Sequence, residues 1–334
     1  MNSRWMRAGA MWAVLVAASA CGSSTAPNDV QGDQGIGADG APGDTVADDS
    51  SVAPDVVAGD DVLVPTDAPP AMRGHMSFVP PTLRPADARR LIVVGDSIST
   101  GTGASMRSRA YYSVLNNNDD ARWPMEMATD LTSHFAHAME FVTVARGGAT
   151  TTTARSMQLP ALRTALPPPA MGHSIVVMTL GGNDVQSALL TGNPTGPVLD
   201  SAIGNLRAIV QYLQDRANFP DGVSIYAMDV YDPSDGEGFI RGCFFNLMLP
   251  EFVLALEVWR TRYIALATEM GFAVIDGLGH FHGHGFHYDN RMNPYYNAAD
   301  PTPWFNDCIH PNDRGHHEIR RLFYEAIDPT YRVN

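Results

Sequence analysis

The stretch that decides the fold runs from Leu91 to Ser99 and reads LIVVGDSIS, an apolar run that leads directly into a polar turn. A continuous run of branched aliphatic residues is typical of a strand buried on both faces of a parallel sheet. Ligands of such sheets bind beyond the carboxyl ends of the strands. The pattern therefore places Ser97 where chemistry usually occurs. A nucleophilic serine there requires a base, an orienting acid and oxyanion donors from the rest of the chain.

The charged residues exclude several classes of function. All 22 basic residues are arginines, and the chain of 334 residues contains no lysine. This absence excludes Walker A phosphate loops, Schiff-base chemistry and Ser-Lys dyads. The net charge is -14, and residues 22–70 carry ten of the 36 acidic residues. The acidic balance gives no support for a nucleic-acid partner.

The first residues have the pattern of an export signal. Arg4 and Arg7 precede a short apolar run that is too short to span a bilayer, and Ala18-Ser19-Ala20 leads to Cys21. Cys21 after two small residues resembles a bacterial lipobox, whose cysteine is acylated, so residues 1–21 are interpreted as the signal of a lipoprotein. Ordinary signal-peptidase cleavage is the alternative. The expected location is the cell envelope, at the outer membrane if the host has one; otherwise the protein is secreted.

Residues 22–75 are expected to form a tether rather than a domain. Residues 22–70 are rich in Gly, Pro, Ala, Asp, Ser and Thr and contain no aromatic residue. Such a composition cannot bury enough apolar surface to offset the entropy of ordering the chain. The folded domain is therefore predicted to span residues 76–334.

The remaining two cysteines, Cys243 and Cys308, are predicted to form a disulfide, because exported proteins pair their cysteines. Such a bond would close a loop of roughly 65 residues and contribute about 3 to 5 kcal/mol in the chain-entropy model. Two buried unpaired thiols are the alternative.

From Arg89 onward, short apolar runs alternate with segments of helical period, which predicts a mostly parallel sheet with crossover helices. Strands are predicted at residues 91–94, 141–145, 174–180, 223–230 and 272–275. Helices are predicted at residues 124–139, 153–165, 197–216, 250–270 and 313–326. The pattern corresponds to a single three-layer α/β domain. Three long connections, residues 101–123, 231–249 and 277–306, are expected at the same rim as Ser97.

Four short stretches follow successive elements: GDSIS at 95–99, GGAT at 147–150, GGND at 181–184 and DCIHP at 307–311. In these stretches, in their order, the sequence resembles the SGNH (GDSL-like) hydrolase superfamily, which is named after its Ser, Gly, Asn and His residues. The resemblance spans nearly all of the chain from Arg89 onward. It implies a flavodoxin-like sheet and ester hydrolysis through an acyl-enzyme.

The chemistry of these residues agrees with that implication. Ser97 is the expected nucleophile and His310 the general base. Asp307 lies three residues before His310, a spacing that lets its carboxylate fix the tautomer of the imidazole. The alternatives are an ordinary turn serine at Ser97 and a helix cap at Asp307.

The expected oxyanion donors are the backbone N-H groups of Ser97 and Gly148 and the side-chain amide of Asn183. Gly148 is preferred to Gly147 because the family pattern places this glycine before a small residue and threonine. Many relatives have Asn upstream of this glycine, whereas this chain has Arg146, a departure that bears on leaving-group contacts.

Three further aspartates receive structural roles. Asp96 and Asp184 are each expected to brace their own turns, and Asp313 is expected to cap the last helix.

Two other patterns point away from cofactors. Residues 101–106, GTGASM, begin like a dinucleotide-binding fingerprint, but Met106 replaces the third glycine. His280, His282, His284 and His287 could ligate zinc, yet residues two apart among glycines point in different directions. We interpret them as a polar lip of the active site and expect neither a metal nor a cofactor.

The sequence therefore predicts an exported serine esterase that acts on carboxylic esters, with a carbohydrate acetylesterase as one form of it. A phospholipase or thioesterase of the same fold is an alternative, and a non-catalytic surface module that binds glycans is another. The expected partners are a small-molecule, glycan or lipid ester and, through the N-terminal lipid only, a membrane. The protein is expected to be a monomer.

Overall fold

The computed structural model describes residues 77–240, 242–243 and 249–333. In this part of the chain five strands form one sheet in the order β2-β1-β3-β4-β5, and all neighbouring strands are parallel. The strands are β1 (Arg90–Gly95), β2 (Glu140–Thr143), β3 (Ser174–Thr179), β4 (Val223–Met228) and β5 (Ala273–Ile275). This is the flavodoxin-like order of a doubly wound sheet. The predicted α/β class and the five-stranded sheet are confirmed.

The centre of the sheet explains why the apolar runs form strands. All six residues of β1 and all six of β3 are buried, and β1 pairs with β3 from Arg90 opposite Ser174 to Gly95 opposite Thr179. Branched aliphatic side chains on both faces of these strands contact helices on both sides. The strand order changes direction between β1 and β3, so the segments after these two strands diverge and leave room for a ligand.

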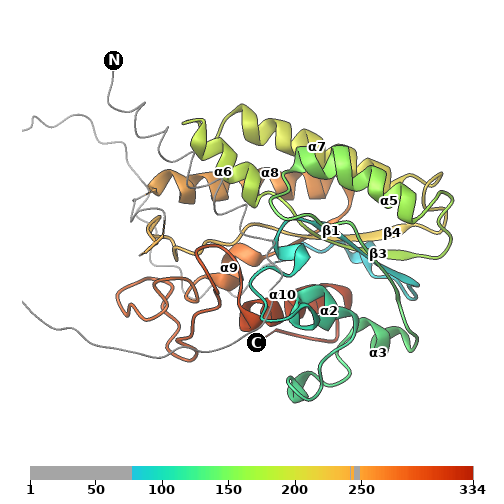
Figure 1. The fold of residues 1–334 in the computed structure, drawn as a ribbon, viewed down its shortest axis with the longest axis horizontal. Helices are drawn as coiled ribbons and strands as arrows, with labels where there is room; N and C mark the ends of the chain where they lie inside the picture. The colour runs from blue at the N-terminus through green and yellow to red at the C-terminus, as the bar shows by residue number, and fades with distance from the viewer. Residues whose placement is uncertain (1–76, 241, 244–248, 334) are drawn as a thin grey trace, which may run out of the picture. The chain divides into compact units, whose positions relative to one another are not determined.

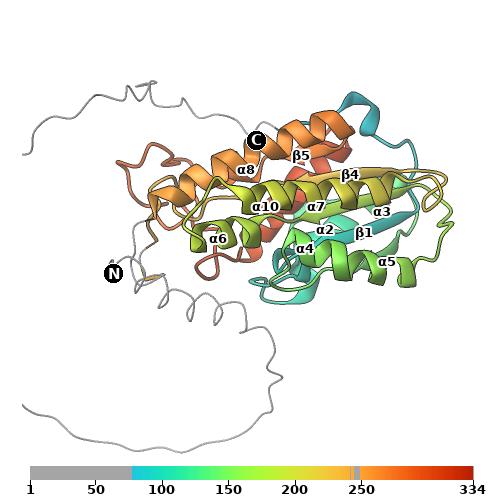
Figure 2. The same cartoon turned by 90° about the horizontal axis from the view of Figure 1, so that it is seen from above.

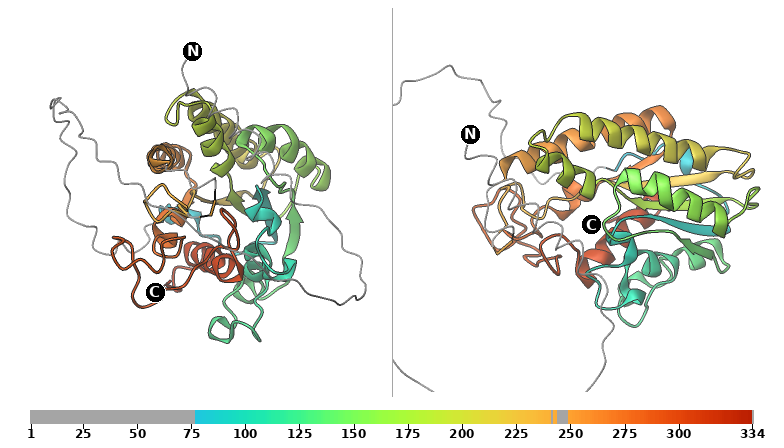
Figure 3. Two further views of the ribbon diagram at one scale, coloured as in Figure 1. Left: turned by 60° about the vertical axis from the view of Figure 1, so that its left-hand side comes forward. Right: turned by 45° about the horizontal axis from the view of Figure 1, so that its top comes forward.

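Helices cover both faces of the sheet (Figure 1). The face with Ile92 and Val94 packs against α5 (Leu159–Ala165), α6 (Gly182–Leu190), α7 (Pro197–Gln214) and α8 (Pro250–Met270). The opposite face, with Leu91 and Val93, packs against α2 (Tyr111–Asn116), α3 (Leu131–Phe135), α9 (Gly277–Phe281) and α10 (Asp313–Ile327). Figures 2 and 3 show the same two layers from other directions.

The long helices begin and end where local chemistry dictates. Pro197 and Pro250 are the first residues of α7 and α8, where the missing proline N-H costs nothing. Gly271 follows the last residue of α8 and caps it, and its φ of 71° is the left-handed conformation that glycine adopts readily. In α10 the side chain of Asn312 accepts a hydrogen bond from the N-H of Gly315 and caps the helix. The predictions of α7, α8 and α10 were right to within two residues.

The predicted helix at residues 124–139 was wrong. The structure has a 3-10 turn, η4 (Pro124–Glu126), and the short α3, whose N-cap Asp130 accepts a hydrogen bond from Ser133. Ala128 and Ala136 have φ values of 62° and 57°, and a continuous right-handed helix cannot pass through such residues. The sequence contains no glycine at either position to indicate these breaks.

The predicted helix at residues 153–165 is three connected pieces. They are α4 (Thr151–Thr153), the π-helical turn η5 (Ala154–Gln158) and α5. The buried side chain of Gln158 accepts a hydrogen bond from the N-H of Gly95 and donates one to its C=O. The π turn therefore holds Gly95, the last residue of β1, which directly precedes the polar turn that carries Ser97.

The connections expected to be long loops contain short helices. Helix α2 lies within residues 101–123, and α9 lies within residues 277–306. Helix α6 lies outside these connections, after β3, where no helix was predicted. Further 3-10 turns are η1 (Pro81–Leu83), η2 (Ile98–Thr100) and η3 (Arg107–Arg109). At the edge of the sheet, Phe78 exchanges two backbone hydrogen bonds with Val274 of β5 and so covers that edge.

The predicted signal at residues 1–21, including Cys21, lies outside the described residues, and so does the predicted tether at 22–75. Among the described residues, no helix combines the length and the apolar character that a membrane span requires.

Candidate active site

The turn after β1 presents Ser97 at the carboxyl edge of the sheet. Gly95 is required there because a Cβ atom at this position would collide with the side chain of Ser99. Ser99 is buried and bonds to Thr179 and Tyr111, each at 2.7 Å. Ser97 itself is half-buried, so its hydroxyl remains accessible at the start of η2.

Asp96 braces this turn, as predicted. One of its carboxylate oxygens accepts hydrogen bonds from the N-H of Ile98 and the hydroxyl of Thr179, both at 3.0 Å. Burial raises the pKa of Asp96 to about 6, although these hydrogen bonds oppose the shift. Through its hydrogen bond with Thr179, Asp96 joins the end of β1 to β3, directly beside Ser97.

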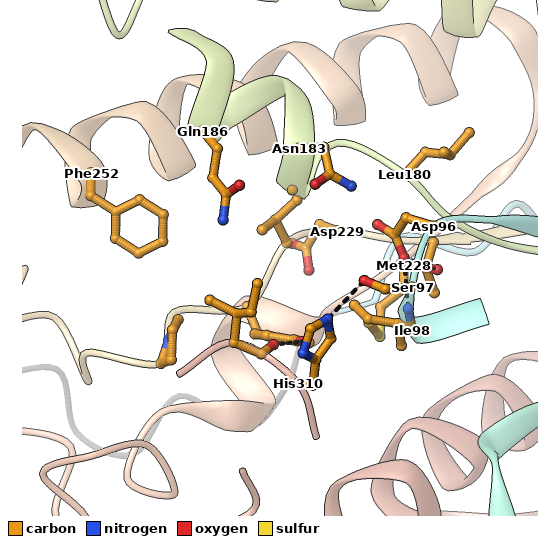
Figure 4. A pocket seen from close by; sticks show the side chains of 16 residues that line it. Asp96, Ser97, Ile98, Leu180, Asn183, Gln186, Met228, Asp229, Phe252 and His310 are labelled. Atoms are coloured by element: carbon orange, nitrogen blue, oxygen red, sulfur yellow. Dashed lines mark hydrogen bonds between the residues drawn. The ribbon is translucent and has the colours of Figure 1, made fainter. Parts of the chain in front are cut away.

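A chain of hydrogen bonds joins Ser97 to His310 and His310 to Asp307, and Figure 4 shows its first link, between Ser97 and His310. His310 Nε2 lies 3.0 Å from Ser97 Oγ, and its Nδ1 lies 2.8 Å and 3.0 Å from the two carboxylate oxygens of Asp307. An ionised carboxylate only accepts hydrogen bonds, so Nδ1 carries the proton and Nε2 is free to accept one from Ser97. Residues more than two hundred positions apart thus form one proton-transfer path.

Asp307 both shapes the histidine turn and orients the imidazole. Its Oδ1 also accepts hydrogen bonds from the N-H groups of Ile309 and His310, at 2.9 Å and 2.8 Å. Partial burial raises the pKa of Asp307, but the hydrogen bonds from His310 and Ile309 outweigh it and hold the pKa below its usual value. Because Asn312 caps α10, the alternative role of Asp307 as a helix cap is wrong.

Contacts outside this turn fix its position. The hydroxyl of Tyr231 donates to the C=O of Ile309 at 2.5 Å, and the N-H of Asn306 donates to the C=O of His310 at 2.8 Å. Cys243 and Cys308 form a disulfide with a Cα–Cα distance of 5.8 Å, which confirms the predicted pairing. The turn with His310 is thus tied to the connection that follows β4.

Asn183 lies in the first turn of α6, on the wall of the pocket that contains Ser97 and His310. Its Nδ2 donates one hydrogen bond to the C=O of Ala149 at 3.0 Å, and its second amide proton is left for a ligand. Gly148 precedes Ala149 and has φ 71°, a conformation that favours glycine, but it is not among the residues that line this pocket. The structure therefore places Asn183 in the same pocket as Ser97, whereas Gly148 does not line that pocket.

Two aspartates have roles that differ from the predictions. Asp184 acts beyond its own turn: its carboxylate accepts hydrogen bonds from the N-H and the hydroxyl of Thr151, at 3.0 Å and 2.8 Å. It therefore supports the start of α4, just after the loop with Gly148. Asp313 does not cap α10: it accepts from the N-H of Ser105 and pairs with Arg109, both at 2.8 Å.

The histidines of residues 280–287 each have a different partner. His280 lies 3.0 Å from Glu318, and His287 lies 2.8 Å from the C=O of Phe239. His282 stacks on Tyr295 and His284 on Trp304, with ring centroids 3.8 Å and 3.5 Å apart. No group of metal-ligating side chains converges within the described residues. His280 thus joins this loop to α10, and the other three histidines contact residues of loops.

The pocket contains residues that the sequence did not indicate. Gln186 of α6 and Phe252 of α8 line it together with apolar side chains. Asp229 also lines it, and burial, with Asp276 nearby, raises its pKa to about 7 despite Arg260. Asn183 and Gln186 are three residues apart, so both lie on one face of α6. A prediction of α6 as a helix would have placed Gln186 beside Asn183.

Several solved structures are similar to this chain. LAE5, an alpha/beta hydrolase enzyme from the metagenome of Lake Arreo, Spain, is 19% identical with a TM-score of 0.46 and covers 73% of this chain and 97% of its own. An extracellular lipase from Streptomyces rimosus is 18% identical with a TM-score of 0.45 and covers 73% and 100%. The acetyl xylan esterase AlAXEase is 18% identical with a TM-score of 0.46 and covers 72% and 100%.

A search of curated proteins found no match. The model of the GDSL-like lipase/acylhydrolase family matches residues 93–318, a range that contains all four stretches from which the resemblance was drawn. With this match over more than half of its length, the chain belongs to the GDSL-like lipase/acylhydrolase family.

Proposed function

We propose that this protein is a serine esterase that hydrolyses carboxylic esters through an acyl-enzyme. The observation that carries the proposal is the hydrogen-bonded chain from Ser97 through His310 to Asp307. His310 takes the proton of Ser97 as Oγ attacks the ester carbonyl, and Asp307 stabilises the resulting imidazolium. His310 then protonates the leaving alcohol and afterwards activates water for deacylation.

The oxyanion of the tetrahedral intermediate requires donors on the side of the carbonyl oxygen. Asn183 supplies an amide proton from the pocket wall. The backbone N-H of Ser97 donates no hydrogen bond within the described residues, so it is available as a second donor. We assign Gly148 to the same set because of its place in the family pattern. Each such donor is typically worth about 3 to 4 kcal/mol in the transition state.

The test is the loss of esterase activity when the nucleophile or base is removed. We expect Ser97→Ala and His310→Ala each to lower kcat on p-nitrophenyl acetate by about a thousandfold or more while the fold persists. Ser156→Ala, which removes an exposed serine of η5, is the matched control and leaves kcat unchanged. Unchanged rates in Ser97→Ala would refute the proposal.

Covalent labelling separates an esterase from a non-catalytic glycan-binding module. A fluorophosphonate reacts with an activated serine, so we expect peptide mass spectrometry to find the label on Ser97 and on no residue of the Ser97→Ala variant. A binding module would remain unlabelled.

We also propose that the chain is exported and anchored through a lipid on Cys21. The lipobox pattern at residues 18–21 supports this, and so does the Cys243–Cys308 disulfide, since such bonds persist in oxidising compartments. A tether of about fifty residues would then hold the domain on the order of 40 Å from the membrane. Metabolic labelling with palmitate should mark the wild-type chain and leave Cys21→Ser unlabelled.

A further inference from the structure

Beyond the reacting groups, one wall of the pocket carries a further side-chain amide, that of Gln186. Gln186 follows Asn183 by three residues on α6, so both side chains lie on the same face of the helix. Figure 4 shows the carboxamide of Gln186 directed into the pocket. In the described part of the chain this carboxamide makes no hydrogen bond, although it is half-buried. It is available to a ligand as both donor and acceptor.

An aromatic ring lies at the same end of the pocket. Phe252 stands in the first turn of α8, and Figure 4 shows its ring beside the amide of Gln186, away from Ser97. Binding sites commonly combine such an apolar surface with a few placed polar groups that select the ligand. A sugar ring matches this pair, because its C-H face packs on an aromatic ring while its hydroxyls bond to an amide.

The charges of the pocket argue against an anionic headgroup. Within the described residues no arginine lines the pocket, and its acidic members are Asp96 and Asp229. The chain contains no lysine that could supply a positive charge instead. A phosphate would therefore meet acidic side chains and no arginine or lysine. The uncharged amides of Asn183 and Gln186 suit a neutral polar substrate.

We propose that Gln186 selects esters of a polyhydroxylated ring, such as an acylated sugar, by bonding to a ring hydroxyl while Phe252 packs against the ring. The proposal rests on the esterase function assigned above. It adds the class of alcohol and the residue that recognises it.

The experiment compares two acetates whose alcohols are six-membered rings. Methyl 2-O-acetyl-β-xylopyranoside carries free hydroxyls, and cyclohexyl acetate has none. We expect Gln186→Leu, which keeps the approximate size of the side chain, to lower kcat/KM for the xyloside about tenfold, the usual cost of a lost hydrogen bond to a bound ligand, and to leave cyclohexyl acetate within about twofold. Gln214→Leu on α7, where Gln214 contacts the C=O of Met270, is the matched control and changes neither rate.

The ratio of the two rates distinguishes recognition from a structural role. If Gln186→Leu lowers both rates equally, or lowers neither, the proposal is overturned, and thermal melts show whether the variant is folded. Wild-type preference for a long-chain phosphatidylcholine over the xyloside would also overturn it. Failure of the esterase function itself looks different, because then neither acetate is hydrolysed in a manner that depends on Ser97.

Discussion

The disulfide between Cys243 and Cys308 gives the sharpest prediction about stability. The two cysteines are 65 residues apart in the sequence, and Cys308 lies between Asp307 and His310. Closing a loop of this length removes chain entropy from the unfolded state equivalent to about 4 kcal/mol at 25 °C. Replacing both cysteines by serine should therefore lower the free energy of unfolding by about this amount.

The effect on catalysis should be much smaller. The turn with His310 keeps its hydrogen bonds from Tyr231, from Asn306 and to the carboxylate of Asp307 when the disulfide is removed. The native position of His310 Nε2 beside Ser97 therefore persists. We expect kcat at 25 °C to stay within about twofold of wild type, because the bond acts mainly on the unfolded chain.

The measurement is equilibrium unfolding in urea, followed by tryptophan fluorescence, beside kcat on p-nitrophenyl acetate. Wild-type protein reduced with dithiothreitol is the control and should unfold at the same urea concentration as Cys243→Ser/Cys308→Ser. A variant that loses kcat by about tenfold with unchanged unfolding would refute the reasoning. The disulfide would then hold the native turn in place rather than restrict the unfolded chain.

Three further substitutions test single atoms of the site. Asp307→Asn places an amide donor beside His310 Nδ1 and so favours the imidazole tautomer that cannot accept the proton of Ser97. It should lower kcat about a thousandfold or more with little change in KM, and a loss below tenfold would contradict the assigned orientation. Asn183→Ala should lower kcat about a hundredfold or more without unfolding the protein, and an equal kcat would remove Asn183 from the oxyanion donors. Burial raises the pKa of Asp184 to about 6, above its usual 3.8, so its contribution to stability is fully present below about pH 4 and is lost as pH rises through 6. The side chain of Asp184→Asn cannot ionise, so the free energy of unfolding of this variant should fall less between pH 4 and pH 7 than that of wild type, by up to about 3 kcal/mol. Urea unfolding at each pH measures both proteins. Parallel pH profiles would disprove the raised pKa.

The fold was largely predictable because four of its five strands, β1, β3, β4 and β5, are almost entirely buried. Such strands must be continuous apolar runs, and the run before Gly95 is one of five that the sequence displays. The short helices were not predictable in this way. Helix α3 is short because the backbone is left-handed at Ala128 and Ala136, which lie on either side of it. Alanine rarely adopts this conformation, so the sequence does not predict it. Helix α6 begins at the Gly181-Gly182 pair, and glycine is a poor indicator of a helix because it has low helix propensity.

The sequence by itself determined which residue types are present and in what order: a serine after the first strand, an Asn after the third, and an Asp and a His near the end. Only the tertiary structure decided that His310 Nε2 lies 3.0 Å from Ser97 Oγ, that Asn183 faces them and that Gly148 does not line the pocket. It alone placed Gln186 and Phe252, from two different helices, at one end of that pocket. The physical reason is that periodicity and propensity act over neighbouring residues, whereas a site is formed by side chains that meet only after the sheet and both helical layers have packed.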